Sequence, residues 1–190
     1  WGKSCLYEHA SQVPLILAGP DVPAGRTVKT AVSHLDAYQT ILDCVGLPLT
    51  GAERDLPGRS LYDIAAETDD DARPVFCEYH AAGAPTGAFL LRRGRYKLNY
   101  YVDMAPELFD LDADPEEMND LAASAEHAGL LRDLEAELRR ICDPEAVDKR
   151  AKADQAALVE RYGGRDAVLR KGAFGGTPAP GYKAEYESGA

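Results

Sequence analysis

Side chains able to take part in chemistry lie near the start of the chain and in its middle. Lys3 and Glu8 precede the apolar run at 13–18, and His80 ends a predicted strand just before a loop that contains glycine and proline. On spacing alone, Lys3 is a solvated surface lysine, and Glu8 either pairs with Lys3 or fixes the local backbone. An imidazole in the position of His80 either hydrogen-bonds an anionic or polar substrate group or bonds to the backbone at the strand end.

The cysteines do not have the spacing of a zinc site. The chain has four of them, Cys5, Cys44, Cys77 and Cys142. They are widely scattered and include no C-x-x-C pair, which argues against zinc. Cys44 and Cys77 lie in apolar stretches, so we predict that both are buried thiols.

Two charged clusters are predicted to lie on the surface. The carboxylates at 110–117 lack the EF-hand spacing with its glycine and terminal glutamate. We therefore predict a turn with a solvated acidic face rather than a calcium loop. The arginines at 92–95 are predicted to form a small basic patch at the tip of a hairpin.

The composition is that of a globular protein with an acidic surface. The chain has 190 residues, 45% hydrophobic and 28% charged, which suffices for one domain or two small packed units. A formal net charge of -11 repels phosphate backbones, so no nucleic-acid partner is expected. No apolar run approaches the roughly 20 residues of a membrane span, so no membrane partner is expected, and cytoplasm and periplasm both stay open. The start at Trp1 rather than Met indicates a fragment.

The first part of the chain shows the pattern of an α/β sheet domain. The near-continuous apolar run at 13–18 predicts a strand buried on both faces, and 27–32 predicts a second short strand. A helix follows, with Ser33 as its cap and Asp36 three residues later in a box-like arrangement. Its apolar residues recur at helical spacing. A further short helix is predicted over 60–66.

The second part predicts a small antiparallel sheet and a helix that covers it. Strands are predicted over 74–80, 88–91, 96–102 and 107–111, with a hairpin turn between the second and third. A long amphipathic helix is predicted over 125–142, with leucines along one face. Because a sheet must bury its apolar face, this helix is expected to cover it.

Several motifs occur in an order that matches one enzyme family. They are Gly2-Lys3-Ser4, Tyr7-Glu8, Val13-Pro14-Leu15-Ile16, Ser33-His34-Leu35-Asp36, Pro57-Gly58-Arg59-Ser60-Leu61, Glu78-Tyr79-His80, Arg92-x-Gly94-x-Tyr96-Lys97 and Glu107-Leu108-Phe109-Asp110-Leu111. Each motif is weak alone, but the ordered set is fairly specific. Over residues 1 to about 142 the chain resembles the C-terminal part of a sulfatase of the alkaline-phosphatase-like superfamily, similar to choline-sulfatase and arylsulfatase members.

The resemblance implies an α/β fold in three parts. Residues 1–70 would form the C-terminal end of the α/β sulfatase catalytic domain. Residues 71–142 would form a subdomain in which a small antiparallel sheet packs against a long C-terminal helix. Residues 143–190 form a tail, helix-prone over 148–162 and extended or disordered from 175 onward, for which oligomerisation is one hypothesis.

The resemblance also implies a role for Lys3 and for cofactors outside this sequence. Family members use a lysine at this point to contact the sulfate, so Lys3 is expected to be catalytic and substrate-binding. An ammonium held there would stabilise charge on the leaving oxygen. His80 is the candidate for a second substrate contact on the chemistry of its imidazole alone. The formylglycine nucleophile and a calcium or other divalent cation are expected upstream, because no cysteine here stands in a C-x-P-S-R-like motif.

Two functional hypotheses follow from these observations. In the first, the full-length protein hydrolyses small sulfate esters, or phosphonate or phosphate esters as members of the same superfamily do, and the isolated chain is inactive. In the second, the chain is a non-catalytic module in which residues 143–190 mediate homo-oligomerisation. The two hypotheses are compatible with each other.

Overall fold

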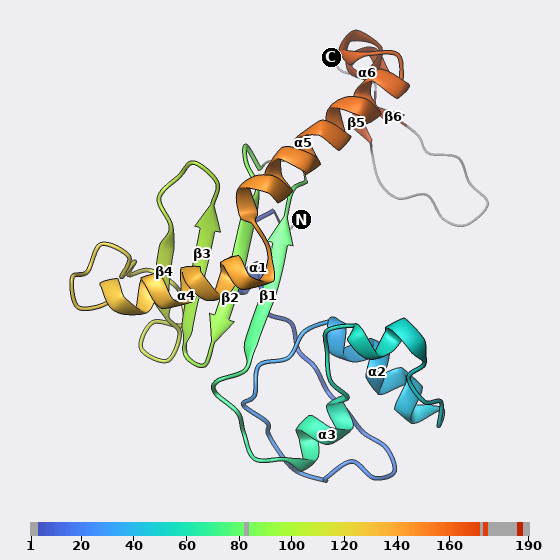
Figure 1. Cartoon of the computed structure of the whole chain (residues 1–190), viewed down its shortest axis with the longest axis vertical. Helices are drawn as coiled ribbons and strands as arrows, with labels where there is room; N and C mark the ends of the chain where they lie inside the picture. Colours follow the sequence, from blue (N-terminus) through green and yellow to red (C-terminus); the bar gives the residue numbers. More distant parts are fainter. Residues whose placement is uncertain (1–3, 82–83, 172, 175–185, 188–190) are drawn as a thin grey trace. The chain divides into compact units, whose positions relative to one another are not determined.

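The computed structural model describes residues 4–81, 84–171, 173–174 and 186–187. The chain forms two compact units, one of residues 1–144 and one of residues 145–190, and each is described by itself. In the first unit, a four-stranded sheet and its helices are joined to a segment that carries α2 and α3 (Figure 1). Within the described ranges, no helix is both long and apolar enough to cross a membrane.

The sheet of the first unit is antiparallel, and its strand order follows the sequence. It consists of β1 (Pro74–Tyr79), β2 (Ala88–Arg93), β3 (Tyr96–Tyr101) and β4 (Glu107–Asp110). Gly94 makes the β2–β3 turn with a φ of 57°, a left-handed conformation that glycine adopts without steric cost. All four predicted strands are confirmed, and the hairpin register pairs Arg93 with Tyr96 and Leu91 with Leu98.

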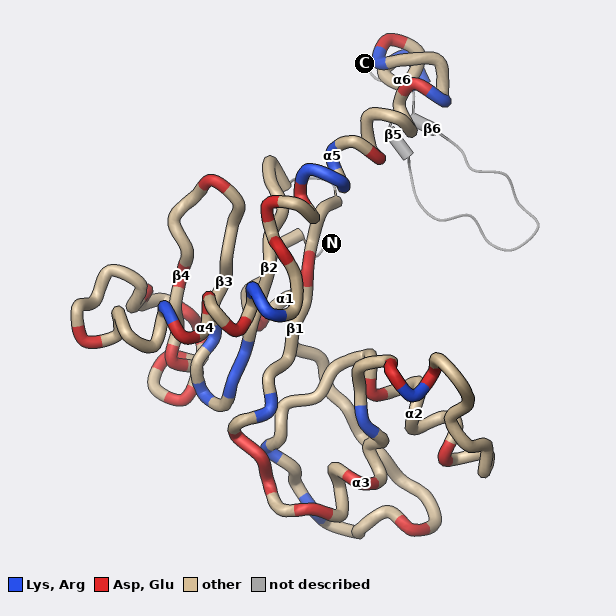
Figure 2. The backbone as a smooth tube through the Cα atoms, viewed as in Figure 1, with Lys and Arg blue, Asp and Glu red and all other residues tan. Residues whose placement is uncertain are grey.

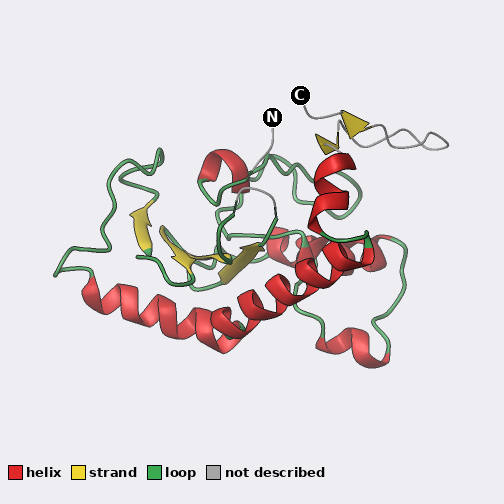
Figure 3. Ribbon diagram, turned by 90° about the horizontal axis from the view of Figure 1, so that it is seen from above, coloured by secondary structure: helices red, strands yellow, loops and turns green. Residues whose placement is uncertain are grey.

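The two faces of the sheet carry different helices. Side chains alternate along each strand, so neighbouring residues such as Arg92 and Arg93 point to opposite faces. The short α1 (Glu8–Ser11) lies on the face of Lys97, with which Glu8 forms an ion pair. The long α4 (Ala128–Ile141) runs along the other face (Figure 3). The predicted covering helix is thus confirmed.

The main core lies between the sheet and α4. Its fully buried side chains come from alternate positions of β2, β3 and β4 and from one face of the helix: Phe89, Leu91, Leu98, Leu108, Leu134 and Leu138. Each such side chain contributes roughly 1.5–3 kcal/mol relative to an exposed one. This burial, rather than helix propensity, holds α4 in place.

The segment before the sheet contains α2 (Leu35–Cys44), a 3₁₀ turn η1 (Gly51–Asp55) and α3 (Leu61–Ala66). The hydrogen bonds predicted between Ser33 and Asp36 form, although the N-cap residue of α2 is His34, whose side chain makes no cap bond. The Leu35 N–H donates to Ser33 Oγ over 3.2 Å, and the Ser33 N–H donates to Asp36 Oδ2 over 2.8 Å. These reciprocal bonds satisfy donors that a helix start leaves unpaired.

Asp36 is the structural centre of this segment. Its carboxylate is fully buried and accepts the N–H of Arg59 over 2.8 Å and the guanidinium of Arg73 over 2.5 Å. Gly58 lets the chain approach this closely: its φ is 117°, and a Cβ there would lie 2.5 Å from the Leu35 carbonyl oxygen. Asp36 therefore ties α2 to the chain before α3 and to the start of the sheet.

The predicted strands at 13–18 and 27–32 are absent from the structure. Both segments are described, and neither forms a strand. Val13, Leu15 and Ile16 are 57%, 58% and 89% exposed. A strand is stable only when a neighbouring strand takes up its backbone hydrogen bonds, and no described strand pairs with these segments. The prediction of a strand buried on both faces is therefore wrong for this chain in isolation.

The prediction of buried thiols is also wrong, since Cys44 and Cys77 are both exposed. Cys44 ends α2, whose predicted apolar face forms but is largely uncovered, with Ile41 and Val45 each 61% exposed. Cys77 lies on β1, an edge strand. An apolar neighbourhood in the sequence buries a thiol only when another element packs over it.

The second unit consists mainly of two helices. They are α5 (Pro144–Arg161), which begins at the last residue of the first unit, and α6 (Arg165–Lys171). Gly163 and Gly164, with φ values of 93° and 83°, separate them as predicted. A two-residue pairing of β5 (Ala173–Phe174) with β6 (Tyr186–Glu187) follows. The extended tail predicted from 175 onward otherwise lies outside the described residues.

Candidate functional site

Lys3, the predicted catalytic residue, lies outside the described residues, and the description begins at Ser4. The chain is held against the sheet from Leu6, three residues after it. Leu6 is 3% exposed and packs with Ala88 and Leu90 in a small apolar cluster on the α1 face. This contact is the first of three that fix consecutive residues after Lys3.

The second contact is made by the next residue, Tyr7. Its hydroxyl donates to Glu107 Oε1 over 2.7 Å, while Tyr101 donates to the other oxygen of the same carboxylate over 3.0 Å. The hydrogen bond to Glu107 raises the pKa of Tyr7 to about 12, because ionising the phenol would place two anions side by side. Burial raises the pKa of Tyr101 as well. Both phenols therefore act as neutral donors.

The third contact is an ion cluster that we call the Glu8 anchor, formed by Glu8, Arg92, Lys97 and Glu117. Lys97 is fully buried, and its Nζ lies 2.9 Å from Glu8 Oε1 and 2.7 Å from Glu117 Oε1. Arg92 Nη1 lies 3.3 Å from Glu8 Oε2. Two cations thus face two carboxylates, so the cluster is electrically balanced, as buried charges must be.

Glu117 also holds the backbone of α1. Its Oε2 accepts the N–H of Glu8 over 2.5 Å. Its own φ is 54°, a left-handed conformation that residues other than glycine adopt at an energetic cost. The Glu117 side chain, 1% exposed, therefore joins the loop after β4, the centre of β3 and the start of α1.

These contacts bear on three expectations about the charged residues. Glu8 pairs with Lys97 and Arg92, while its expected pairing with Lys3 falls on a residue outside the described ranges. The carboxylates predicted to be a solvated turn include two buried ones, Asp110 and Glu117. The arginines predicted as a surface patch are partly exposed, at 28%, 32% and 45% for Arg92, Arg93 and Arg95, and they pair with Glu8, Glu137 and Asp110, respectively. Basic and acidic segments accordingly lie side by side around the β2–β3 hairpin (Figure 2).

His80, the second predicted site residue, lies just after β1. Its ring packs edge-on against Phe89, with ring centres 5.3 Å apart, and its Nε2 lies 3.7 Å from Glu78 Oε2. Its side chain is 18% exposed. Phe89 belongs to the face that α4 covers, whereas Leu6, Tyr7 and Glu8 lie on the opposite face. The described residues therefore place His80 and the chain that follows Lys3 on different sides of the sheet.

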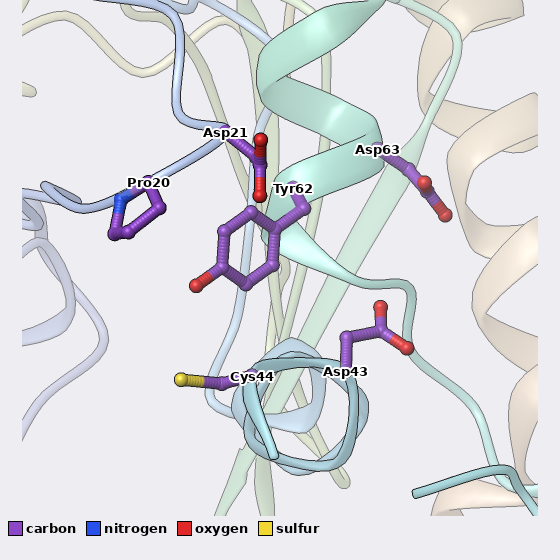
Figure 4. Close-up of a pocket in the computed structure, with 6 residues that line it drawn as sticks. All are labelled: Pro20, Asp21, Asp43, Cys44, Tyr62 and Asp63. Atoms are coloured by element: carbon purple, nitrogen blue, oxygen red, sulfur yellow. The ribbon is translucent and has the colours of Figure 1, made fainter. Parts of the chain in front are cut away.

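A separate open hollow of about 540 Å³ lies between the 20–21 loop, the end of α2 and the start of α3 (Figure 4). Its lining residues are Pro20, Asp21, Asp43, Cys44, Tyr62 and Asp63. The Tyr62 hydroxyl interacts with the Cys44 thiol, which raises the pKa of Tyr62. The carboxylates of the hollow are exposed and do not converge on one point, so we assign it no chemistry.

The described residues do not fit a metal site. Among them, no three histidine, cysteine, aspartate or glutamate side chains are placed to hold an ion together. The buried carboxylates Glu8 and Glu117 are already neutralised by Lys97 and Arg92. No step of a reaction is therefore derived through a metal held by this part of the chain.

Comparison with known proteins identifies the family. Residues 1–143 match the family model described as N-sulphoglucosamine sulphohydrolase, C-terminal. The chain belongs to this family. The family model matches residues 1–143 of this sulphohydrolase-family chain, and the first unit consists of residues 1–144. The match is therefore confined to the first unit.

Curated relatives of this sulphohydrolase-family chain are sulfatases of greater length. Arylsulfatase K of Danio rerio is 35% identical over 155 residues, which is 77% of this chain and 29% of the relative. Arylsulfatase K of Mus musculus is 31% identical over 184 residues, covering 91% of this chain and 31% of the relative. The chain thus spans less than a third of the length of the relatives that it matches.

Solved structures agree with the family assignment. A 2-O GAG sulfatase superposes with a TM-score of 0.61 at 25% identity, covering 80% of this chain and 33% of that one. A phosphonate monoester hydrolase from Silicibacter pomeroyi gives a TM-score of 0.60 at 28% identity, covering 74% and 30%. The predicted sulfatase resemblance and the α/β fold class with its small antiparallel sheet are both confirmed.

Sequence reasoning missed the Glu8 anchor, although one signal for it was present. Lys97 is the second residue of the strand predicted over 96–102, between Tyr96 and Leu98. If another element covers that face of the sheet, the lysine must find buried acids. Which acids it finds depends on Glu8 and Glu117, which are 89 and 20 residues away along the chain.

Proposed function

We propose that this chain is the C-terminal part of a sulfuric ester hydrolase, to which it supplies the Lys3 ammonium and the C-terminal sheet-and-helix subdomain. The observation that carries the proposal is the match of residues 1–143 to a sulphohydrolase C-terminal family. The anchoring of Leu6, Tyr7 and Glu8 supports it, because these contacts give the neighbouring Lys3 a fixed base.

The chemistry proposed for Lys3 is electrostatic. A sulfate ester is anionic, and negative charge grows on the leaving oxygen as the S–O bond breaks. An ammonium held in advance near that oxygen stabilises the charge without reorganising solvent. The nucleophile and the ligands of the divalent metal are proposed to lie in another region of the full-length protein. That region corresponds to the part of the relatives that this chain does not span.

The uncovered apolar surface of the first unit supports this division of the protein. Val13, Leu15 and Ile16 are exposed here, although their pattern is that of a strand buried on both faces. We propose that in the full-length protein this segment joins the sheet of the catalytic α/β domain. Lys3 would then stand close to the edge of that sheet.

Replacement of Lys3 by alanine in the full-length enzyme is expected to lower kcat/KM for an aryl sulfate at least tenfold, or about 1.4 kcal/mol. The loss follows from removing a cation that is needed most in the transition state. The matched control is Lys29→Ala, because Lys29 is an exposed lysine for which no catalytic role is proposed. An unchanged kcat/KM in Lys3→Ala would remove Lys3 from the site.

His80 is proposed as a second contact to an anionic or polar group of the substrate. Its ring lies at a strand end next to a loop, where an imidazole can donate a hydrogen bond. Its replacement by alanine in the full-length enzyme is expected to raise KM about threefold to tenfold, since one hydrogen bond contributes about 0.5–1.5 kcal/mol. A wild-type KM would show that His80 takes no part in substrate binding.

The structural similarity to a phosphonate monoester hydrolase makes phosphonate esters a second candidate class of substrate. The same ammonium would stabilise either anionic ester, so Lys3 does not separate them. Turnover of an aryl sulfate, an aryl phosphonate and a 2-O-sulfated sugar by the full-length enzyme would rank the three classes. We propose the sulfated sugar as the preferred class, because the family description and the 2-O GAG sulfatase both point to it.

Homo-oligomerisation through residues 143–190 stays a proposal for the second unit. It is supported by apolar side chains exposed there, of which Leu158, Tyr162 and Leu169 are 52%, 59% and 64% exposed. Light scattering on the protein with and without residues 143–190 would test it. An equal number of subunits in both forms would count against it.

A further inference from the structure

The Glu8 anchor fixes the position of Glu8 on the sheet more tightly than is needed to stabilise the fold. Lys97 and Glu117 are 0% and 1% exposed, and removing two such charges from water carries a large desolvation cost. Well-packed apolar residues would hold α1 to the sheet without that cost. The ion cluster also fixes the orientation of Glu8, because both its side chain and its backbone N–H are bound.

The left-handed backbone conformation of Glu117 supports the same conclusion. A residue with a side chain is held at a φ of 54° only when its surroundings determine its conformation. Here the surroundings are Lys97 and the Glu8 N–H, both bound by the Glu117 carboxylate. The conformation of the loop after β4 is thus coupled to the position of α1.

We infer that Glu117 and Lys97 are positioning residues, which hold the chain after Lys3 so that its ammonium meets the substrate. The inference rests on the proposed function of Lys3. Five peptide units separate Lys3 from Glu8 and span at most about 18 Å. Because Leu6, Tyr7 and Glu8 are each fixed to the sheet, the free length before Leu6 is only three units, or about 11 Å.

A double-mutant cycle in the full-length enzyme tests this inference. The variants are Lys3→Ala, Glu117→Gln and the two combined, with kcat/KM for an aryl sulfate as the readout. Glu117→Gln keeps the side-chain volume and removes one buried charge. It is expected to lower kcat/KM about tenfold when Lys3 is present and less than twofold when Lys3 is already alanine. Such non-additivity identifies residues that act through one another.

Other outcomes of the cycle overturn the inference in ways that can be told apart. If Lys3→Ala lowers kcat/KM but Glu117→Gln has no effect, or an equal effect in both backgrounds, Glu117 is only structural and the proposed role of Lys3 stands. If Lys3→Ala has no effect, the proposed role of Lys3 fails and the inference fails with it.

A control and a milder variant keep the test independent of folding. Glu137→Gln breaks the 2.7 Å ion pair with Arg93 on the opposite face of the sheet and is expected to stay within twofold of the wild-type kcat/KM. Arg92→Gln removes the outermost pair of the anchor, 3.3 Å long and partly exposed, and is expected to lower kcat/KM about threefold only when Lys3 is present. If Glu117→Gln does not fold, an additive effect of Arg92→Gln overturns the inference instead.

Discussion

Replacing Lys97 by methionine is expected to lower the free energy of unfolding of this chain by about 3–5 kcal/mol, the cost of breaking a buried ion pair from one side. The methionine fills most of the space but leaves the carboxylates of Glu8 and Glu117 without the ammonium they share, and only Glu8 keeps a cation, Arg92. Urea denaturation followed by circular dichroism would measure the change. A loss of this size would be a large part of the stability of an ordinary domain.

The second unit offers a matched control for this substitution. Lys152 also pairs with an acid, Asp148, over 2.7 Å, and the two side chains are 51% and 9% exposed. Because its ammonium stays partly in water, Lys152→Met is expected to lower the free energy of unfolding by less than Lys97→Met does. Adding Glu117→Gln to Lys97→Met is expected to recover part of the loss, since one uncompensated charge is removed. Equal losses in the two lysine variants would contradict the account of a buried cluster.

Replacing Asp36 by alanine is also expected to lower the free energy of unfolding by about 3–5 kcal/mol. The substitution leaves one guanidinium and two backbone N–H donors without their acceptor. The carboxylate is fully buried and is shared by Ser33, Arg59 and Arg73. Its loss should release α2 from α3 and from the start of the sheet. Hydrogen exchange of the α2 and α3 amides would therefore rise more than exchange in β2 and β3.

Asp43 provides the control for Asp36 within the same helix. It is exposed near the end of α2, and Asp43→Ala is expected to change the unfolding free energy by no more than about 0.5 kcal/mol. Similar exchange rates in the two variants would show that Asp36 does not organise this segment.

The elements that the sequence predicts correctly are those whose stabilising contacts are local or periodic. The hydrogen bonds at the start of α2 need only Ser33 and Asp36, three residues apart, and they form as predicted. The β2–β3 hairpin needs a turn at Gly94 and two alternating strands. The leucines of α4 repeat at helical spacing, so a helix with one apolar face follows without knowledge of its partner.

The predictions that fail are those that depend on a distant partner. The run at 13–18 has the composition of a buried strand, but a strand requires a neighbour, and no described residue supplies one. Cys44 and Cys77 have apolar neighbours in the sequence and are exposed in the structure. Burial is a property of what packs against a residue, and local composition does not specify it.

By itself, the sequence determined the antiparallel sheet, its covering helix and the resemblance to sulfatases that marks Lys3 as a candidate, and it offered His80 on the chemistry of its imidazole alone. Only the tertiary structure decided that Glu8, Lys97 and Glu117 meet in one buried cluster, and that the chain after Lys3 and the ring of His80 lie on opposite faces of the sheet. The reason is physical. Hydrophobic periodicity is written along the chain, whereas ion pairs between residues 20 to 89 positions apart exist only once the strands have set their register.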